Sequence, residues 1–295
     1  MTKASATVAF YRKAVGKFLA FLGDDKEREV SEITRQHIVS FRNEQAKTLA
    51  PKTVNHDLKC LKSAFKVARR DGLLVEDPAE FVEVVRQVGE GNRRPFTVPE
   101  LQAVLEVADD EWRSLVLFGL YTGQRLGDLA RLTWAQVDLV KEEVRLATSK
   151  TDRRIILPLA APLRRHLEAL PAGDDPHAPL HPRAYEIVTR ESRSGSLSNQ
   201  FADLLAQAGQ REKASHKAKA KDGAGRGGRR QSNALSFHCL RRTATTLLHE
   251  AGVPAAVVQE LVGHDSEETH RVYINVGRDA LASAAAKLPD LLPIQ

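Results

Sequence analysis

Apolar residues recur at intervals of three and four along the first 86 residues, and this spacing predicts short helices. The first helix is predicted over 7–22, and the second over 31–45 with Ser31 or Thr34 as its N-cap. Pro51 opens a third helix, and a short fourth helix is predicted over 77–85. The third helix has an apolar stripe that is formed by Val54, Leu58, Leu61, Phe65 and Ala68. We therefore predict a compact four-helix domain over 1–86.

Basic residues follow the stripe of the third helix. Lys59, Lys62, Lys66 and Arg69 are spaced by three, four and three residues, and Lys52 precedes them. Residues at this spacing lie side by side on a helix, so the helix has a core face and a basic row beside it. The row is predicted to contact DNA phosphates, and the alternative is the solvated surface of an ordinary helical bundle.

A second domain is predicted over 97–295, after a linker over 87–96 that contains two glycines and has no apolar periodicity. Residues 112–122 are nearly all apolar, which predicts a buried helix. Alternating residues over 143–147 and apolar, β-branched residues over 154–157 predict a β-hairpin. Further helices are expected, among them 163–170, 197–208 and 279–288. The fold class is therefore mainly α with a small antiparallel β-sheet, as a helical domain followed by an α+β domain.

Composition limits the classes of protein to consider. The chain has 295 residues, of which 42% are hydrophobic, and this is enough for two globular domains. Its two cysteines, Cys60 and Cys239, are far apart, which argues against a disulfide framework and for a reducing cytosol. We see no signal peptide, and the longest apolar run, 115–121, is too short to span a membrane.

Positive charge is concentrated in two zones. The net charge is +6, and residues 211–231 hold eight basic and two acidic residues, as do residues 42–70. The remainder of the chain therefore sums to −6, because 6 − 6 − 6 = −6. Two basic zones on an acidic chain fit a polyanion such as DNA, and a solubilising face with a mobile loop is the alternative. The glycine-rich loop over 211–231 contributes the candidate DNA contacts Lys217, Lys219, Lys221, Arg226, Arg229 and Arg230.

Several polar residues occur in an unusual order along the second domain. Thr122-Gly123-Gln124-Arg125 is followed by Asp128 and Leu129, and Lys150 lies at the tip of the predicted hairpin. His238 and Arg241 are three residues apart at a predicted helix start, so they share a face. Gly263 ends a helix before His264, and Tyr273 follows nine residues later. Taken singly, each of these residues has a structural explanation, such as a cap, a salt bridge or a packed ring.

Taken in order, the six positions Arg125, Lys150, His238, Arg241, His264 and Tyr273 resemble the signature of the tyrosine recombinases, or phage-type integrases. The resemblance implies a SAM-like core-binding domain and a catalytic domain that acts in DNA integration and recombination, often of mobile genetic elements. It also implies that Asp128 occupies the supporting acidic position, which is usually Glu. The Asp side chain is one methylene group shorter than that of Glu.

The chemistry explains these residue types. Arg125 and Arg241 would hold the oxygens of a phosphodiester, and His264 would donate to them. The resemblance makes Tyr273 the nucleophile that forms a 3′-phosphotyrosyl bond, with His238 as general base and Lys150 as general acid. No metal or other cofactor is expected, since neither a Cys/His cluster nor a phosphate-binding glycine motif is found. A type IB topoisomerase-like enzyme, a non-catalytic DNA-binding regulator, a metal-dependent nuclease and a structural DNA-bridging protein remain as alternatives.

The C-terminal helix over 279–288 has a small apolar stripe with two readings. It packs on its own domain, or it docks on a neighbouring protomer, as the terminal helices of the family often do. The second reading predicts a free monomer that becomes a tetramer on paired sites of double-stranded DNA. The expected location is the cytoplasm, at the nucleoid and away from any membrane.

Overall fold

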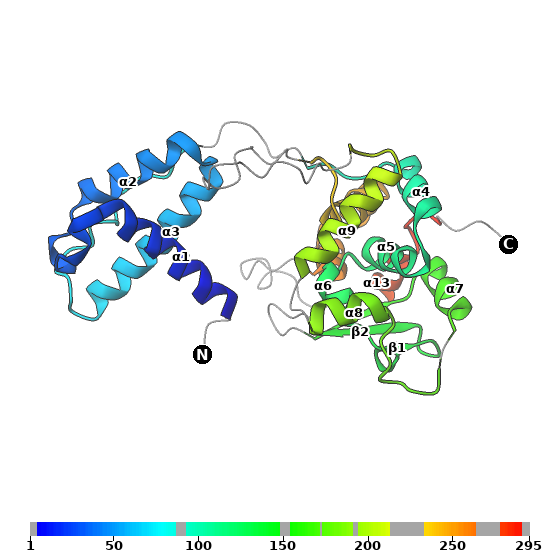
Figure 1. Cartoon of the computed structure of the whole chain (residues 1–295). Coiled ribbons are helices and arrows are strands. Elements are labelled where there is room, and N and C mark those ends of the chain that lie inside the picture. The colour runs from blue at the N-terminus through cyan, green and yellow to red at the C-terminus, as the bar shows by residue number, and fades with distance from the viewer. Residues whose placement is uncertain are drawn as a thin grey trace. The chain divides into compact units, whose positions relative to one another are not determined.

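The computed structural model describes residues 5–86, 93–147, 154–171, 173–190, 194–212, 233–263 and 278–290 (Figure 1). The chain divides into two compact units, Met1–Glu90 and Gly91–Gln295.

The N-terminal unit is built from three α-helices among its described residues. These are α1 (Ser5–Leu22), α2 (Arg35–Thr48) and α3 (Pro51–Arg70), with the short 3-10 helices η1 (Gly23–Glu27) and η2 (Val30–Glu32) between α1 and α2. Four residues of the predicted stripe of α3 are buried, and the fifth, Ala68, is partly buried. The core of the unit is formed by Phe18, Ile38, Phe41, Leu58, Leu61, Phe65, Ala79 and Val82, among others. Thr34 is the residue before α2, and its backbone N–H donates to His37 Nδ1 at 3.1 Å.

Residues 77–85 do not form the predicted fourth helix: residues 78–81 form a turn, and the residues after it have no regular secondary structure. Side chains of α2 and α3 take the backbone groups there. Arg42 donates to the carbonyl of Glu83 at 2.7 Å. The Asn55 amide binds both the N–H and the C=O of Val85, at 2.7 and 2.8 Å. These backbone groups already have hydrogen-bond partners on neighbouring helices, so forming the i to i+4 hydrogen bonds of a helix would not stabilise the segment further.

The C-terminal unit combines helices with one small sheet. Its elements are α4 (Val98–Val107), α5 (Asp110–Thr122), α6 (Leu126–Leu129), η3 (Trp134–Gln136), β1 (Val137–Asp138), β2 (Glu143–Ala147), β3 (Arg154–Pro158), α7 (Ala161–Ala169), α8 (Pro182–Thr189), α9 (Ser194–Gln207), α10 (His238–Glu250), α11 (Ala255–Val262) and α13 (Arg278–Ala285). The strands lie in the order β1-β2-β3 and are antiparallel, with Ala147 opposite Arg154 at the end of the hairpin. The predicted fold class, mainly α with a small antiparallel sheet, is confirmed. The sequence did not predict α8.

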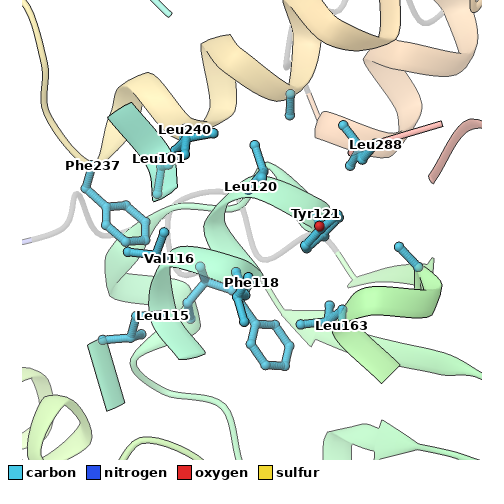
Figure 2. Packing of buried hydrophobic residues seen from close by; sticks show 14 of the residues in the cluster. Leu101, Leu115, Val116, Phe118, Leu120, Tyr121, Leu163, Phe237, Leu240 and Leu288 are labelled. Atoms are coloured by element: carbon cyan, nitrogen blue, oxygen red, sulfur yellow. The ribbon is translucent and has the colours of Figure 1, made fainter. Parts of the chain in front are cut away.

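Helix α5 lies at the centre of this unit (Figure 1), and its residues from Leu115 to Thr122 are all buried. Phe237 and Leu240 pack against it (Figure 2). A Cβ on Gly119 would lie only 2.8 Å from side-chain atoms of both, so glycine is what lets α10 approach α5 so closely. This packing fixes the start of α10, where two candidate site residues are located.

Helix α13 packs on its own domain, against α11 and β3. Ala284, Ala285 and Leu288 are buried in the same core as α5, and Lys287 Nζ donates to the Ala251 carbonyl at 3.1 Å. The Tyr121 hydroxyl also donates to the carbonyl of Pro289, just beyond the helix. In the single chain, the C-terminal helix therefore packs on its own domain, which is the first of the two arrangements predicted for it.

Candidate active site

Helix α10 presents two of the predicted residues in its first turn, His238 and Arg241. His238 is exposed at the helix start, whereas Arg241 is only 5% exposed. Arg241 Nη1 donates to the carbonyl of Gly123 at 3.0 Å, and Nη2 donates to the carbonyl of Gly263 at 2.5 Å. The buried guanidinium thus joins the ends of two other helices to α10.

Both of these carbonyls belong to glycines in the left-handed conformation. Gly123 ends α5 with φ +64°, and Gly263 ends α11 with φ +71°. Other residues adopt such a φ only at a cost. Gly123 turns the chain two residues before Arg125, and Gly263 turns it directly before His264. These helix ends therefore set the direction in which the chain enters both site loops.

Gln124 is a site residue that sequence reasoning missed. Its side chain is 3% exposed, and Nε2 donates to the carbonyls of Thr122 at 3.0 Å and Val262 at 3.2 Å. These carbonyls are among those that the ends of α5 and α11 leave without helical partners. Gln124 therefore ties the Arg125 loop to the end of α11. A long amide after a helix-ending glycine was the available signal, but the sequence did not reveal its partner.

Arg125 is half-buried at the N-terminus of α6. Its carbonyl accepts from the backbone N–H of Asp128 at 2.9 Å, and the Asp128 side chain is buried below. His181, which the sequence analysis did not identify, supports the end of α6. Its Nδ1 donates to the Leu129 carbonyl at 3.0 Å, while Nε2 lies 2.9 Å from the hydroxyl of Ser114. Burial lowers the pKa of His181 to about 4, so its ring is neutral.

Positive charge surrounds His238. Partial burial of its ring lowers its pKa below the ordinary value of 6.5, and the charges of Arg241, Arg93, Arg125 and Arg242 lower it further. These four guanidinium groups are therefore near enough to act on the imidazole. A neutral ring at pH 7 can accept a proton, and the arginines around it can hold an anion.

Three of the six predicted positions, Arg125, His238 and Arg241, are thus brought into one region. Lys150 lies in the connection 148–153, and His264 and Tyr273 lie in 264–277, outside the described residues. Gly263, which precedes the segment 264–277, lies close to β3, which follows the connection 148–153: a Cβ on Gly263 would lie 3.3 Å from Ile155 Cδ1 of β3. The predicted loop contacts Lys217, Lys219, Lys221, Arg226, Arg229 and Arg230 also fall outside the described residues.

The basic row on α3 divides into two groups. Lys62 Nζ donates to the carbonyl of Glu80 at 3.2 Å, and Arg69 forms an ion pair with the Glu80 carboxylate at 3.1 Å. Lys52, Lys59 and Lys66 are exposed. The second group is the one whose charges remain open to a ligand of the N-terminal unit.

No group of three or more His, Cys, Asp or Glu side chains among the described residues has an arrangement that could hold a metal ion. None of the helices that the structure describes is long and apolar enough to cross a membrane.

Comparison with known sequences gives matches over nearly the whole chain. The profile of the Phage integrase family matches residues 95–279, and that of the Phage integrase SAM-like domain matches residues 1–84. The chain is 25% identical to the tyrosine recombinase XerC of Roseiflexus sp. (strain RS-1), over 97% of this chain and 88% of that protein. It is 27% identical to the tyrosine recombinase XerD of Mycobacterium leprae (strain TN), over 94% and 89%.

Solved structures with the same fold include complexes with DNA. A lambda integrase dimer bound to a core site aligns with a TM-score of 0.65 at 19% identity, over 94% of this chain and 93% of that one. The Tn1549 transposon integrase in complex with transposon right end DNA aligns with a TM-score of 0.65 at 16% identity, over 96% and 93%. A lambda integrase tetramer bound to a Holliday junction aligns with a TM-score of 0.61 at 17% identity, over 94% and 75%. These similarities establish the fold.

Proposed function

The chain belongs to the phage integrase family and is a site-specific DNA recombinase, and from this premise we propose that it cuts and rejoins DNA through a covalent 3′-phosphotyrosyl intermediate. The observation that carries the proposal is the buried Arg241, which joins the ends of α5 and α11 to α10. Arg241 and Arg125 hold the two non-bridging oxygens of the cut phosphate, where negative charge increases during in-line attack. His264 donates to the same oxygens.

In this mechanism, the Tyr273 phenolic oxygen attacks phosphorus and the bond from phosphorus to the 5′ oxygen breaks. The phenolic proton passes to His238, whose lowered pKa keeps the ring neutral and ready to accept it. Lys150 gives a proton to the leaving 5′ oxygen. Rejoining runs these steps in reverse on a new 5′ hydroxyl, so the bond energy stored in the phosphotyrosyl ester makes ATP unnecessary. Asp128 supports the start of α6 beneath Arg125, and no metal or other cofactor takes part.

The test of this chemistry is formation of a covalent adduct on nicked DNA. The duplex is one enriched from a random pool by repeated binding to the wild-type chain. The wild-type protein should give a band that survives denaturing electrophoresis, whereas Tyr273→Phe should bind the duplex and give none. An adduct that persisted in Tyr273→Phe would place the nucleophile elsewhere. Binding without an adduct in the wild-type chain would favour a DNA-binding regulator or a DNA-bridging protein.

The DNA contacts away from the site come from two basic zones. On α3 the exposed group Lys52, Lys59 and Lys66 is the stronger part of the row, because Lys62 and Arg69 already bind Glu80. The loop 211–231 adds sequence-independent affinity through its lysines and arginines. Neutralising either group should flatten the plot of log affinity against log salt by about 0.9 for each DNA phosphate that the protein no longer neutralises. An unchanged slope would make that group a solvated surface.

The assembly that carries out strand exchange is a tetramer on two paired DNA sites, formed from a free monomer. In the tetramer, α13 leaves its own domain and packs on the neighbouring protomer. It uses the same apolar face, with Ala284, Ala285 and Leu288, that packs on its own domain in the single chain. A truncation before Ala280 should leave a monomer that binds one site but forms no junction, as measured by sedimentation and junction assays. A truncated chain that recombined normally would refute the hand-over, and one that unfolded would make α13 a permanent part of its own core.

A type IB topoisomerase-like enzyme shares the chemistry but needs no paired sites. An adduct with normal relaxation of supercoiled DNA and no junction would favour it. We also propose that the domain boundaries lie at 1–86 and 97–295 and that the protein acts at the nucleoid in the cytoplasm. Limited proteolysis of the full chain and fractionation of cells test these two statements.

A further inference from the structure

The segment 93–97 crosses the first turns of α10. The Arg94 backbone N–H donates to the Ala234 carbonyl at 3.2 Å. The Phe96 N–H donates to the buried hydroxyl of Thr243 at 2.8 Å, and that hydroxyl in turn donates to the carbonyl of Cys239 at 2.7 Å. These bonds fix the backbone of the segment beside the helix that carries His238 and Arg241.

The side chain of Arg242 also links the same segment to α10. One of its terminal nitrogens, Nη1, donates to the carbonyl of Arg93. Arg242 follows His238 by four residues on α10, so the two side chains share a face of the helix. The bond to Arg93 uses one of the five N–H donors of the guanidinium, which leaves the others for a ligand. Arg93 and Arg242 are both exposed.

The charges of Arg93 and Arg242 are not balanced locally. No carboxylate forms an ion pair with either of them in the part of the chain that the structure describes. Arg94, between Arg93 and the start of α4, differs in this respect, because both of its terminal nitrogens bind the Glu100 carboxylate, at 2.7 and 2.5 Å. Two neighbouring arginines that lack an acidic partner, one of them held by a backbone bond, form a place for an anion.

We propose that Arg93 and Arg242 form a second phosphate site, which binds a DNA backbone phosphate next to the one that is cut. The inference rests on the proposed function, since Arg125 and Arg241 are assigned to the cut phosphate itself. Arginine suits the task because its planar fork binds phosphate oxygens in pairs. The site would fix the register of the DNA strand on α10.

The second site also has a consequence for the base. In the free protein, the charges of Arg93 and Arg242 disfavour protonation of His238. A phosphate bound to these two arginines offsets their charge and raises the affinity of His238 for a proton. His238 would then become a better base when the DNA strand is correctly seated, which is when Tyr273 must lose its proton.

The first measurement compares the salt dependence of binding to a random-sequence duplex of about 30 base pairs. Arg93→Gln and Arg242→Gln should each flatten the slope of log affinity against log salt by about 0.9, and each should weaken binding about tenfold at low salt. Arg190→Gln is the matched control, since Arg190 is an exposed arginine that forms an ion pair with Glu186, and it should leave the slope unchanged. Wild-type slopes in both Arg93→Gln and Arg242→Gln, or an equal loss in Arg190→Gln, would overturn the proposal.

The second measurement locates the phosphate. Single uncharged methylphosphonates are placed at each position of an enriched duplex. One of them beside the cut should weaken wild-type binding about tenfold while changing the affinity of Arg242→Gln less than about twofold. Equal sensitivity of both proteins at every position would refute the site. Arg93→Gln guards against a folding defect, because Arg93 is exposed and its bond to Arg242, made by its backbone carbonyl, is kept in the variant.

Failure of the proposed function would look different. The wild-type chain would then bind the duplex and form no adduct, yet the salt slopes and the methylphosphonate series would still decide whether Arg93 and Arg242 bind a phosphate. Conversely, normal adduct formation with wild-type slopes in both variants would leave the chemistry intact and remove the second site.

Discussion

Replacing Gly123 by alanine tests whether the close approach of α5 and α11 holds the site together. Gly123 has φ +64°, and a Cβ there would lie 3.0 Å from Val262 Cγ1 and 3.2 Å from Val262 Cγ2. Val262 is fully buried, so it has no room to rotate away. The added methyl group must therefore push apart the loop before Arg125 and the end of α11.

The expected loss of stability in Gly123→Ala has two contributions. The left-handed conformation costs a residue with a Cβ about 1–2 kcal/mol, and overpacking a filled core adds about 1–3 kcal/mol. Gly252→Ala separates the two, because Gly252 has φ +75° but no atom within 4 Å of its added Cβ. We expect Gly252→Ala to lower the free energy of unfolding by about 1–2 kcal/mol and Gly123→Ala by about 2–5 kcal/mol.

Tryptophan fluorescence during urea unfolding is a suitable assay. The chain has two tryptophans, Trp112 and Trp134, and both lie in the C-terminal unit, so their signal reports on that unit. Adding Val262→Ala to Gly123→Ala removes the methyl groups that clash. The double variant should be more stable than the sum of the single losses predicts, by about 1 kcal/mol. Adduct formation by Gly123→Ala should fall on the order of tenfold to a hundredfold, because the Gly123 carbonyl positions Arg241.

Two results would refute this reasoning. Equal losses of stability in Gly123→Ala and Gly252→Ala would show that α11 yields to the extra methyl group without cost. Strict additivity of Gly123→Ala and Val262→Ala would show that the two side chains do not meet.

Three further predictions concern buried polar groups. Burial lowers the pKa values of His181 and His166 to about 4, so the unfolded chain binds protons first as the pH falls. The free energy of unfolding should be highest above pH 6.5 and should fall as the pH is lowered towards 4, by at most about 3 kcal/mol per histidine. Urea titrations at several pH values should show a smaller fall in His166→Leu. Gln124→Leu leaves the Val262 carbonyl without its side-chain donor, so it should lower the free energy of unfolding by about 1–3 kcal/mol. The variant should also give less covalent adduct, with no change in the salt slope of DNA binding. An unchanged adduct yield would make Gln124 purely structural. In the N-terminal unit, Asp57→Ala removes the buried partner of Lys17. If the two units unfold separately, this change should lower the free energy of the transition followed by circular dichroism by about 1–3 kcal/mol and leave the tryptophan transition unchanged. A shift of both transitions would show that the two units unfold together.

The sequence predicted those features whose causes are local. The stripe of α3 repeats at helical spacing, so one helix face had to be apolar, and the structure buries it. The sequence predicts a helix that ends at residue 122 and another that Gly263 ends, and both Gly123 and Gly263 adopt the left-handed conformation that glycine allows. Motif order and local context predicted Arg125, His238 and Arg241 as site residues; the structure brings them into one region, and their catalytic roles remain predictions. Lys150, His264 and Tyr273 remain predictions from the same order.

Features that depend on distant partners were decided by tertiary structure. Residues 77–85 carry a local helix signal, but Arg42 and Asn55 bind their backbone groups from other helices. The role of Gln124 depends on carbonyls more than 130 residues away, since its bond to Val262 spans 138 positions. No periodicity reports such a bond, because side-chain direction and the approach of two helix ends are set by packing.

The same distinction applies to charge and to the C-terminal helix. The sequence located basic residues, but only the fold separated Lys62 and Arg69, which bind Glu80, from Lys59 and Lys66, which are exposed. The apolar stripe of the C-terminal helix required some partner, and it was the complementary surface of α11 and β3 that made the chain's own domain that partner. Sequence thus determined which helix faces must be covered and which residue types could carry out the phosphate chemistry. The three-dimensional packing determined which surfaces and charges meet, because burial and hydrogen bonding depend on distances that chain position does not encode.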